Sequence, residues 1–284
     1  MGSSTKYQHH LELQLGSNSG QTICQHQYTT YPLRLSPLFR LEGAKSQRGY
    51  LYLINTSPGL LAGDTLNLFV KLTEGSSLYF TDQAATKVHP MPIINTKAKI
   101  DYQLEIESEA SLELMPEPII LYTDATLEQN TKIKLHPNAN LFLSEIILPG
   151  RLAKAESYQF NYFWNQLQIV DRQDRLLFCD AMRLQGKHNP FQNQDLFASL
   201  PILGNAIAIL PAAIDLNKLI STVESQTTVN IHHLETALTT LPEVNGILIR
   251  AMANKTYALK NYFASVLNCV RQITQQPSLP YIPK

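Results

Sequence analysis

Three segments of the chain share one pattern that aligns without gaps, and this repeat limits the possible folds more than any other feature. The segments are residues 70–81, 104–115 and 133–144. Each has two apolar residues spaced by two, a tight polar turn with a small residue, and a second apolar pair spaced by two. Such alternation is typical of strands. Recurring units of this length indicate stacking, so the sequence predicts a layered β architecture with about four strands per period.

The same alternation extends beyond the repeat, from residue 11 to about 180, and turn-forming residues separate the runs. Two β architectures remain open. In a β-sandwich the repeat would reflect ordinary hairpins that happen to be alike. In an irregular β-helix the three segments would be successive layers of one stack.

The C-terminal third changes to the period of an amphipathic helix. Residues 215–225 place four apolar side chains on one helical stripe. A longer helix is predicted from Asn254, a candidate N-cap, to just before Pro277. The final residues, 277–284, contain three prolines and are predicted to form a loose arm.

We therefore expect a single domain over residues 1–284. Its β-rich part would span 11–210, its helix-containing part 211–276 and its tail 277–284. The fold class is mainly β with two C-terminal helices.

Charge and cysteine content exclude several classes of partner and compartment. The 23 basic and 23 acidic residues cancel to a net charge of zero, so no overall field favours nucleic acid or a membrane surface. Charged residues make up only 16% of the chain, so repulsion between molecules is weak, which is typical of a protein that occurs in a complex. The three cysteines are far apart in the sequence and no run of about 18 apolar residues occurs, so we expect a cytoplasmic protein.

Common catalytic signatures are absent from the sequence. It has no phosphate-binding glycine loop, no Gly-x-Ser-x-Gly and no His-Glu-x-x-His. Cys24 and His26, two apart on a predicted strand, suit a soft metal but are only two ligands. A hydrolase with paired carboxylates and a sugar-binding protein with an aromatic platform stay open as alternatives. Seven aromatic residues are candidates for that platform: Tyr28, Tyr31, Tyr50, Tyr52, Phe160, Tyr162 and Trp164.

Acidic residues recur at the end of each repeat. Asp82, Glu117 and Glu145 each follow one copy within two residues of its last strand. If the copies stack in register, these carboxylates lie on one edge or lumen, joined by Asp64 and Asp124 from neighbouring turns. Spaced carboxylates with water could pass a cation such as Ni²⁺ along. The alternative is that they are ordinary turn carboxylates.

Five segments in order resemble the urease accessory protein D family (UreD, also called UreH). They are PGLLAGD at 58–64, TDQAATK at 81–87, LMPEPIILY at 114–122, SEIILPGR at 144–151 and GILIRAMAN at 246–254. The second is similar to the family's Thr-x-x-Ala-Ala-Thr-Lys box, and the fifth to its Arg-x-x-Ala box. Leu60, Ala62 and Pro118 depart from the family's usual residues, which affects loop detail.

This resemblance implies a non-catalytic urease maturation factor rather than an enzyme. The family's partners would be the accessory proteins UreF and UreG and apo-urease, with no permanently bound cofactor and only transient Ni²⁺. Its fold would be a layered β-superhelix with two helices and an internal tunnel.

On that basis we expect four acidic residues to line or gate a nickel path: Asp64, Glu117, Asp124 and Glu145. Lys87 and Arg151 would be their buried charge partners, because uncompensated buried carboxylates are unfavourable. Thr86 and Arg250 would support the site. A purely structural role for these residues in holding turns remains the alternative.

Overall fold

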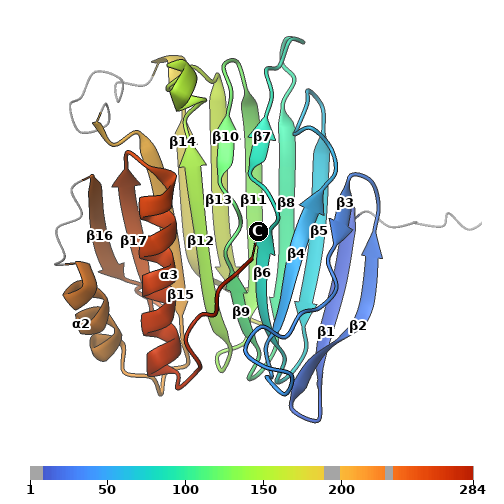
Figure 1. Ribbon diagram of the computed structural model, residues 1–284, viewed down its shortest axis with the longest axis vertical. Coiled ribbons are helices and arrows are strands. Elements are labelled where there is room, and N and C mark those ends of the chain that lie inside the picture. Colours follow the sequence, from blue (N-terminus) through green and yellow to red (C-terminus); the bar gives the residue numbers. More distant parts are fainter. Residues whose placement is uncertain (1–8, 189–198, 228–232, 284) are drawn as a thin grey trace, which may run out of the picture.

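The alternating segments form two β-sheets that lie face to face. The computed structural model describes residues 9–188, 199–227 and 233–283. Figure 1 shows the two sheets one behind the other, with the helices against one of them. Strands dominate the described residues and neither sheet closes on itself, so the prediction of a mainly β protein with two helices is confirmed.

The first sheet has seven strands. Its five central strands run parallel to their neighbours, and an antiparallel strand closes each edge. In order across the sheet they are β14 (Leu176–Leu184), β13 (Tyr162–Val170), β11 (Thr126–Leu135), β8 (Ala98–Ile106), β5 (Thr65–Leu72), β1 (Leu11–Asn18) and β2 (Gln21–Thr29).

The second sheet has ten strands, of which four central ones are parallel. Its main path is β16 (Leu234–Thr240), β17 (Gly246–Ala253), β15 (Ile202–Ile209), β12 (Asn140–Leu148), β9 (Ser111–Leu114), β6 (Ser77–Asp82), β4 (Gly49–Asn55) and β3 (Leu33–Leu35). Two short strands, β10 (Ile119–Leu121) and β7 (Thr86–Val88), pair with each other, and β10 also pairs with β12. Two 3₁₀ turns, at Leu152–Lys154 and Gly186–His188, complete this part of the chain.

Each copy of the sequence repeat leaves a strand of the first sheet, turns, and enters a strand of the second. In the first sheet Val70 pairs with Leu104, and Leu104 with Ile133. In the second sheet the matching positions pair in the same way. The gapless alignment therefore corresponds to stacking in register. From one copy to the next the chain contains three strands, not four, because each crossing uses one strand of the first sheet and two of the second.

The alternating apolar side chains form the main core between the sheets. Leu66, Leu68, Val70 and Leu72 of β5 all face inward and are nearly inaccessible to solvent. Burying each such side chain stabilises the fold by about 1.5–3 kcal/mol. The space between the sheets is therefore mostly dry and well packed, which makes any polar stretch there informative.

Helices α2 (Leu216–Thr227) and α3 (Thr256–Ile273) cover the outer face of the second sheet and form a second core with it. Helix α3 contacts β12, β15 and β17. The packing is close: a Cβ atom added at Gly204 of β15 would lie 2.8 Å from the ring of Phe263. The predicted cap at Asn254 is wrong. The N-cap is Lys255, and it makes no side-chain capping hydrogen bond.

The C-terminal tail has no regular secondary structure but packs against the body. The Leu279 amide donates to Asn268 Oδ1 of α3 at 2.7 Å, and Leu279 and Ile282 contact the second core. The described end of the chain lies over β6 in Figure 1. The tail is therefore packed and not the loose arm predicted from the prolines, because the apolar side chains of Leu279 and Ile282 pack against the second core. Neither described helix is both long enough and apolar enough to cross a membrane.

Candidate functional site

Polar side chains interrupt the apolar inner faces of both sheets at one level of the stack. On β11, Gln129 and Thr131 take inward positions between Leu127 and Ile133, and both are buried. Glu145 of β12 faces them from the second sheet. Because buried polar groups require hydrogen-bonding partners, this level of the interior forms a polar network.

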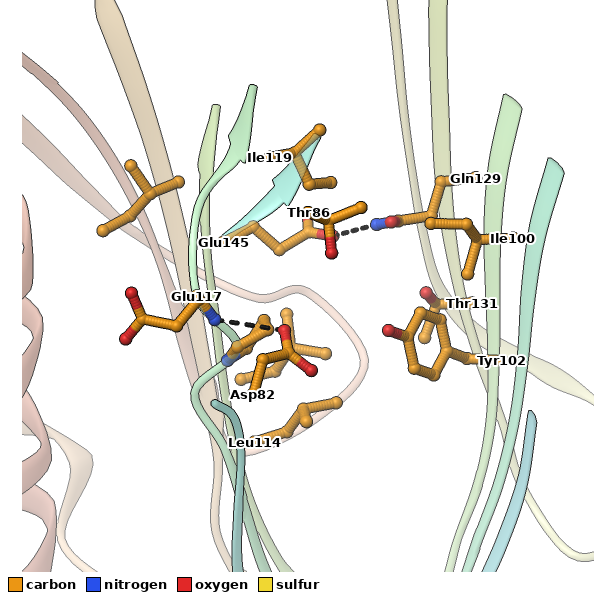
Figure 2. Close-up of a pocket in the computed structure, with 13 residues that line it drawn as sticks. Asp82, Thr86, Ile100, Tyr102, Leu114, Glu117, Ile119, Gln129, Thr131 and Glu145 are labelled. Atoms are coloured by element: carbon orange, nitrogen blue, oxygen red, sulfur yellow. Dashed lines mark hydrogen bonds between the residues drawn. The ribbon is translucent and has the colours of Figure 1, made fainter. Parts of the chain in front are cut away.

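This network surrounds a small cavity, which Figure 2 shows between the two sheets. The space open to the centres of water-sized spheres is about 30 Å³. Roughly 10–15 Å³ on this measure holds one water molecule, so the cavity can hold very few waters or one ion. Its lining consists of Asp82, Thr86, Ile100, Tyr102, Leu114, Pro116, Glu117, Ile119, Gln129, Thr131, Leu143, Glu145 and Ile146.

Glu145 is held by amide donors from the opposite sheet. Gln129 Nε2 donates to its Oε1 at 2.5 Å, and Asn165 Nδ2 of β13 donates to its Oε2 at 2.7 Å. Burial raises the pKa of the Glu145 carboxyl above its ordinary value, although these two hydrogen bonds oppose the shift. The carboxylate is thus positioned and solvated by neutral groups, at an energetic disadvantage for its charge.

Tyr102 of β8 lies across the cavity from Glu145, whereas Asp82 lies on the same sheet as Glu145, at the end of β6. Burial raises the pKa of the Tyr102 phenol, and the charges of Asp82 and Glu145 raise it further. The phenol therefore stays protonated at neutral pH and can donate a hydrogen bond into the cavity. Both carboxyl groups line the same small cavity.

Asp82 is the last residue of β6, and Glu117 lies between β9 and β10, where the second sheet is interrupted. The backbone N–H of Glu117 donates to Asp82 Oδ2 at 3.2 Å. In Figure 2 the Asp82 carboxylate points into the cavity, whereas that of Glu117 points away from it, towards the helix. There Lys260 Nζ of α3 lies 2.5 Å from Glu117 Oε2.

A row of polar side chains continues from Glu145 to the edge of the sheets. Glu145, Asn205 and Arg250 are register neighbours across β12, β15 and β17. Arg250 donates to Asn205 Oδ1 and, from its other terminal nitrogen, to Asp180 Oδ1 of β14, both at 2.6 Å. Arg250 thereby joins the two sheets. Its side chain is 40% exposed, so the row reaches solvent.

Two of the four acidic residues predicted for the path lie elsewhere. Asp64 Oδ2 accepts the backbone N–H of Leu61 at 2.8 Å within a turn. Asp124, also in a turn, forms an ion pair with Lys187 in which both side chains are nearly half exposed. Neither lines the cavity. Glu117 and Glu145 do line it, as does the predicted supporting residue Thr86.

The prediction that Lys87 and Arg151 are buried charge partners is wrong. Successive residues of a strand point to opposite faces, so Thr86 faces the cavity and Lys87 faces solvent. Arg151 is 37% exposed; its Nε donates to Glu156 at 2.8 Å, and its guanidinium lies over the Tyr122 ring. Neutral amides satisfy Glu145 without burying a second charge.

Sequence reasoning missed most of the neutral side chains of the site. The predicted path omits Asp82, although this residue is one of the three carboxylates that follow the repeat. Tyr102, Thr131, Gln129, Asn165 and Asn205 were not singled out at all. A signal was present for two of them, since Gln129 and Thr131 are polar residues at the inward period of an otherwise apolar strand.

The size of this cavity argues against an organic substrate at this site, and side-chain burial argues against an aromatic sugar platform. Organic ligands occupy pockets of roughly 300–1,000 Å³, far larger than this cavity. Of the aromatic residues considered as a sugar platform, Tyr50, Tyr52 and Phe160 are buried. Within residues 9–188, 199–227 and 233–283, no three or more His, Cys, Asp or Glu side chains are grouped to hold a metal ion, so Cys24 and His26 gain no further ligands.

The fold and the cavity define a β protein with a small polar cavity between its two sheets, large enough for a few water molecules or one ion. Comparison with known proteins identifies its family. The family model described as UreD urease accessory protein matches residues 8–284. The urease accessory protein UreD of Trichodesmium erythraeum (strain IMS101) is 51% identical over 275 residues, covering 96% of this chain and 98% of that protein.

More distant relatives carry the same description. The urease accessory protein UreH of Helicobacter acinonychis (strain Sheeba) is 28% identical over 190 residues, covering 66% of this chain and 68% of that protein. The chain therefore belongs to the UreD family of urease accessory proteins. Because this family assists an enzyme and is not itself one, membership confirms the expectation that the chain is not an enzyme.

Proposed function

We propose that this protein is a cytoplasmic, non-catalytic scaffold for nickel insertion into apo-urease, and that Ni²⁺ passes transiently through its polar cavity. Its partners would be UreF and UreG, which bring the metal, and the apo-urease subunits, which receive it. The layers of the two sheets would be the coils of a β-superhelix that carries the path. The three free cysteines, two of them exposed, support a reducing compartment.

One observation carries this proposal: Asp82 and Glu145 share an interior cavity of ionic size. Nickel takes nitrogen and oxygen ligands, so carboxylates with water can hold it. The hydroxyl of Tyr102 and the amides of Gln129 and Asn165 supply further polar atoms from the opposite sheet. The row through Asn205 to Arg250 extends the polar interior to the sheet edge.

The cavity is also better suited to transient binding of Ni²⁺ than to tight binding. A carboxyl group must be deprotonated to bind a metal, and the raised pKa of Glu145 lets protons compete with the ion. Each of its oxygens already accepts one amide hydrogen bond, which leaves fewer lone pairs for a metal ion. Weak binding at successive sites is what conduction requires, because the ion must leave as readily as it enters.

Replacing the cavity carboxylates tests the proposal. Asp82→Asn and Glu145→Gln keep side-chain size and remove charge, and each is expected to lower urease activation about tenfold, the scale on which lost metal-site groups reduce affinity or activity. Urease activity would be measured after co-expression, with pulldown of UreF, UreG and urease to verify assembly.

Asp124→Asn is the matched control, because this carboxylate lies outside the cavity and is nearly half exposed. It should leave activation unchanged. If Asp82→Asn and Glu145→Gln assemble normally and activate urease as well as the unmodified protein does, the cavity is not the nickel path and the protein is a passive adaptor.

A further inference from the structure

Glu117 occupies a rigid position at the wall of the cavity. It stands between Pro116 and Pro118, whose rings restrict the backbone on both sides. Its backbone N–H is also hydrogen-bonded to Asp82. The main chain of Glu117 is therefore fixed, and its carboxylate can change position only by rotation about the side-chain bonds.

Those torsions decide whether the Glu117 carboxylate faces the helix or the cavity. In the structure it faces Lys260 of α3, and the side chain of Glu117 is 10% exposed. A rotation about the side-chain bonds would bring the carboxylate to the side where Asp82 and Glu145 lie. Without a cation, three carboxylates in so small a space repel one another, so the outward orientation is favoured while Lys260 is present.

Lys260 is placed where its contact can be released. It lies within five residues of the start of α3, at the end that has no side-chain cap. Its own side chain is 41% exposed. The opposite end of the helix is anchored by Arg271, which is 1% exposed and bonded to Glu113. The ion pair with Glu117 can therefore open without detaching α3 from the sheet.

We propose that Lys260 is a latch that holds the Glu117 carboxylate outside the cavity, and that its release adds a third carboxylate ligand beside Asp82 and Glu145. The inference rests on the proposed function, because it concerns the affinity of the same cavity for a divalent cation. With the latch closed the cavity offers two carboxylates and retains an ion weakly. With the latch open it offers three and retains the ion more strongly.

Nickel titration of the purified full chain tests the latch. NiCl₂ binding would be measured by calorimetry for the unmodified protein and for Lys260→Met, which keeps length and removes charge. The expected result is about tenfold tighter binding, equivalent to about 1.4 kcal/mol. The double variant Lys260→Met with Glu117→Gln should lose that gain. Lys255→Met, an exposed lysine at the start of the same helix, should leave the affinity unchanged.

The outcomes distinguish failure of the latch from failure of the nickel path through the cavity. If Glu145→Gln weakens nickel binding but Lys260→Met does not change it, the latch is refuted while the nickel path is still supported. A gain that survives Glu117→Gln also refutes the latch. If Glu145→Gln leaves nickel binding unchanged, or if neither the unmodified protein nor any variant binds nickel, the proposed nickel path through the cavity is refuted, and the latch is refuted with it. Glu117 is only 10% exposed, so Lys260→Met removes the cation beside a largely buried carboxylate, and the melting temperature of the variant is measured first; Lys260→Gln provides a second variant.

Discussion

Glu145 occupies an inward position of β12, where apolar side chains normally stand. Its neighbours on the same inner row, Leu143 and Ile147, belong to the main core. The carboxylate is tolerated because Gln129 and Asn165 reach it from the other sheet. These hydrogen bonds offset only part of the hydration that the carboxylate loses on burial. The pKa of Glu145 is therefore raised.

That shift predicts how Glu145 affects stability at different pH values. Its folded-state pKa is raised above the ordinary value of 4.5, so above pH 4.5 the folded state binds more protons than the unfolded state. Stability contributed by this group is present below pH 4.5 and is lost as pH rises through the folded-state pKa. Glu145→Gln should remove this loss and stabilise the protein at neutral pH.

Thermal unfolding of Glu145→Gln and of the unmodified protein measures the effect. The melting temperature of the variant should be higher by about 2–4 °C at pH 7, corresponding to roughly 1 kcal/mol, with no difference near pH 4. The Asn165 amide can reorient to accept from the new donor. If Glu145→Gln has a lower melting temperature than the unmodified protein at pH 7 but not at pH 4, the Glu145 charge does not destabilise the fold and the prediction is contradicted.

Helix α3 is held to the second sheet by buried charges as well as by apolar contacts. Arg271 donates to both oxygens of Glu113 on β9, and its Nη1 also donates to Glu42 at 2.9 Å. Arg48 completes the cluster, and all four side chains are at most 7% exposed. Burial alone would lower the pKa of Arg271, but the hydrogen bond and charge of Glu113 raise it. The cluster joins the helix, a central strand and the loop before β4.

Removing one cation from this cluster should strongly destabilise the fold. Arg271→Met leaves Glu113 and Glu42 buried with one positive charge instead of two, and such losses cost about 3–5 kcal/mol. Urea unfolding at neutral pH measures the difference in unfolding free energy. Adding Glu113→Gln to Arg271→Met should recover part of the loss, because the charges balance again.

A surface arginine serves as the control for that measurement. Arg172 is 58% exposed and lies 3.7 Å from Glu107, so Arg172→Met should cost no more than about 1 kcal/mol. Equal effects at Arg271 and Arg172 would mean that the buried cluster contributes no more to holding α3 than a solvated ion pair does.

At the scale of the whole molecule, the two faces of the stack differ. The second sheet is covered by α2, α3 and the tail, whereas the outer face of the first sheet carries solvated ion pairs such as Lys71 with Glu105 and Lys132 with Asp174. With a net charge of zero and only 16% charged residues, long-range repulsion between copies is weak. This balance suits a component of a complex, in which partners cover part of the surface.

The charge balance predicts the solubility of the isolated chain. Solubility should be lowest near the sequence pI of about 7.1 and should rise severalfold at pH 5, where the chain carries a net positive charge. Turbidity measured against pH for the chain alone, and for the chain co-expressed with its partners, tests this. A soluble isolated chain with no minimum near neutrality contradicts the expectation.

Local patterns were sufficient to identify the layers of the fold. Alternation predicts the strands, and the gapless repeat makes stacking in register one of two open arrangements, which the pairing of Val70 with Leu104 and of Leu104 with Ile133 then decides. The helical stripe of residues 215–225 corresponds to α2. These features follow from the chain alone because period, turn chemistry and apolar burial act over neighbouring residues. The resemblance to the UreD family could be recognised for the same reason, because five short segments carry it in order along the chain.

The composition of the cavity depended on residues that meet from opposite sheets. Whether Asp82 or Asp64 faces the interior is decided by the side of the strand or turn on which each falls once the sheets close. Lys87 and Thr86 differ by one position and point in opposite directions. Glu145 meets Asn165 across the two sheets, and Arg271 meets Glu113 from 158 residues away. Such pairings are set by packing over long sequence distances, because a buried charge takes whichever donor the folded chain brings within hydrogen-bonding reach.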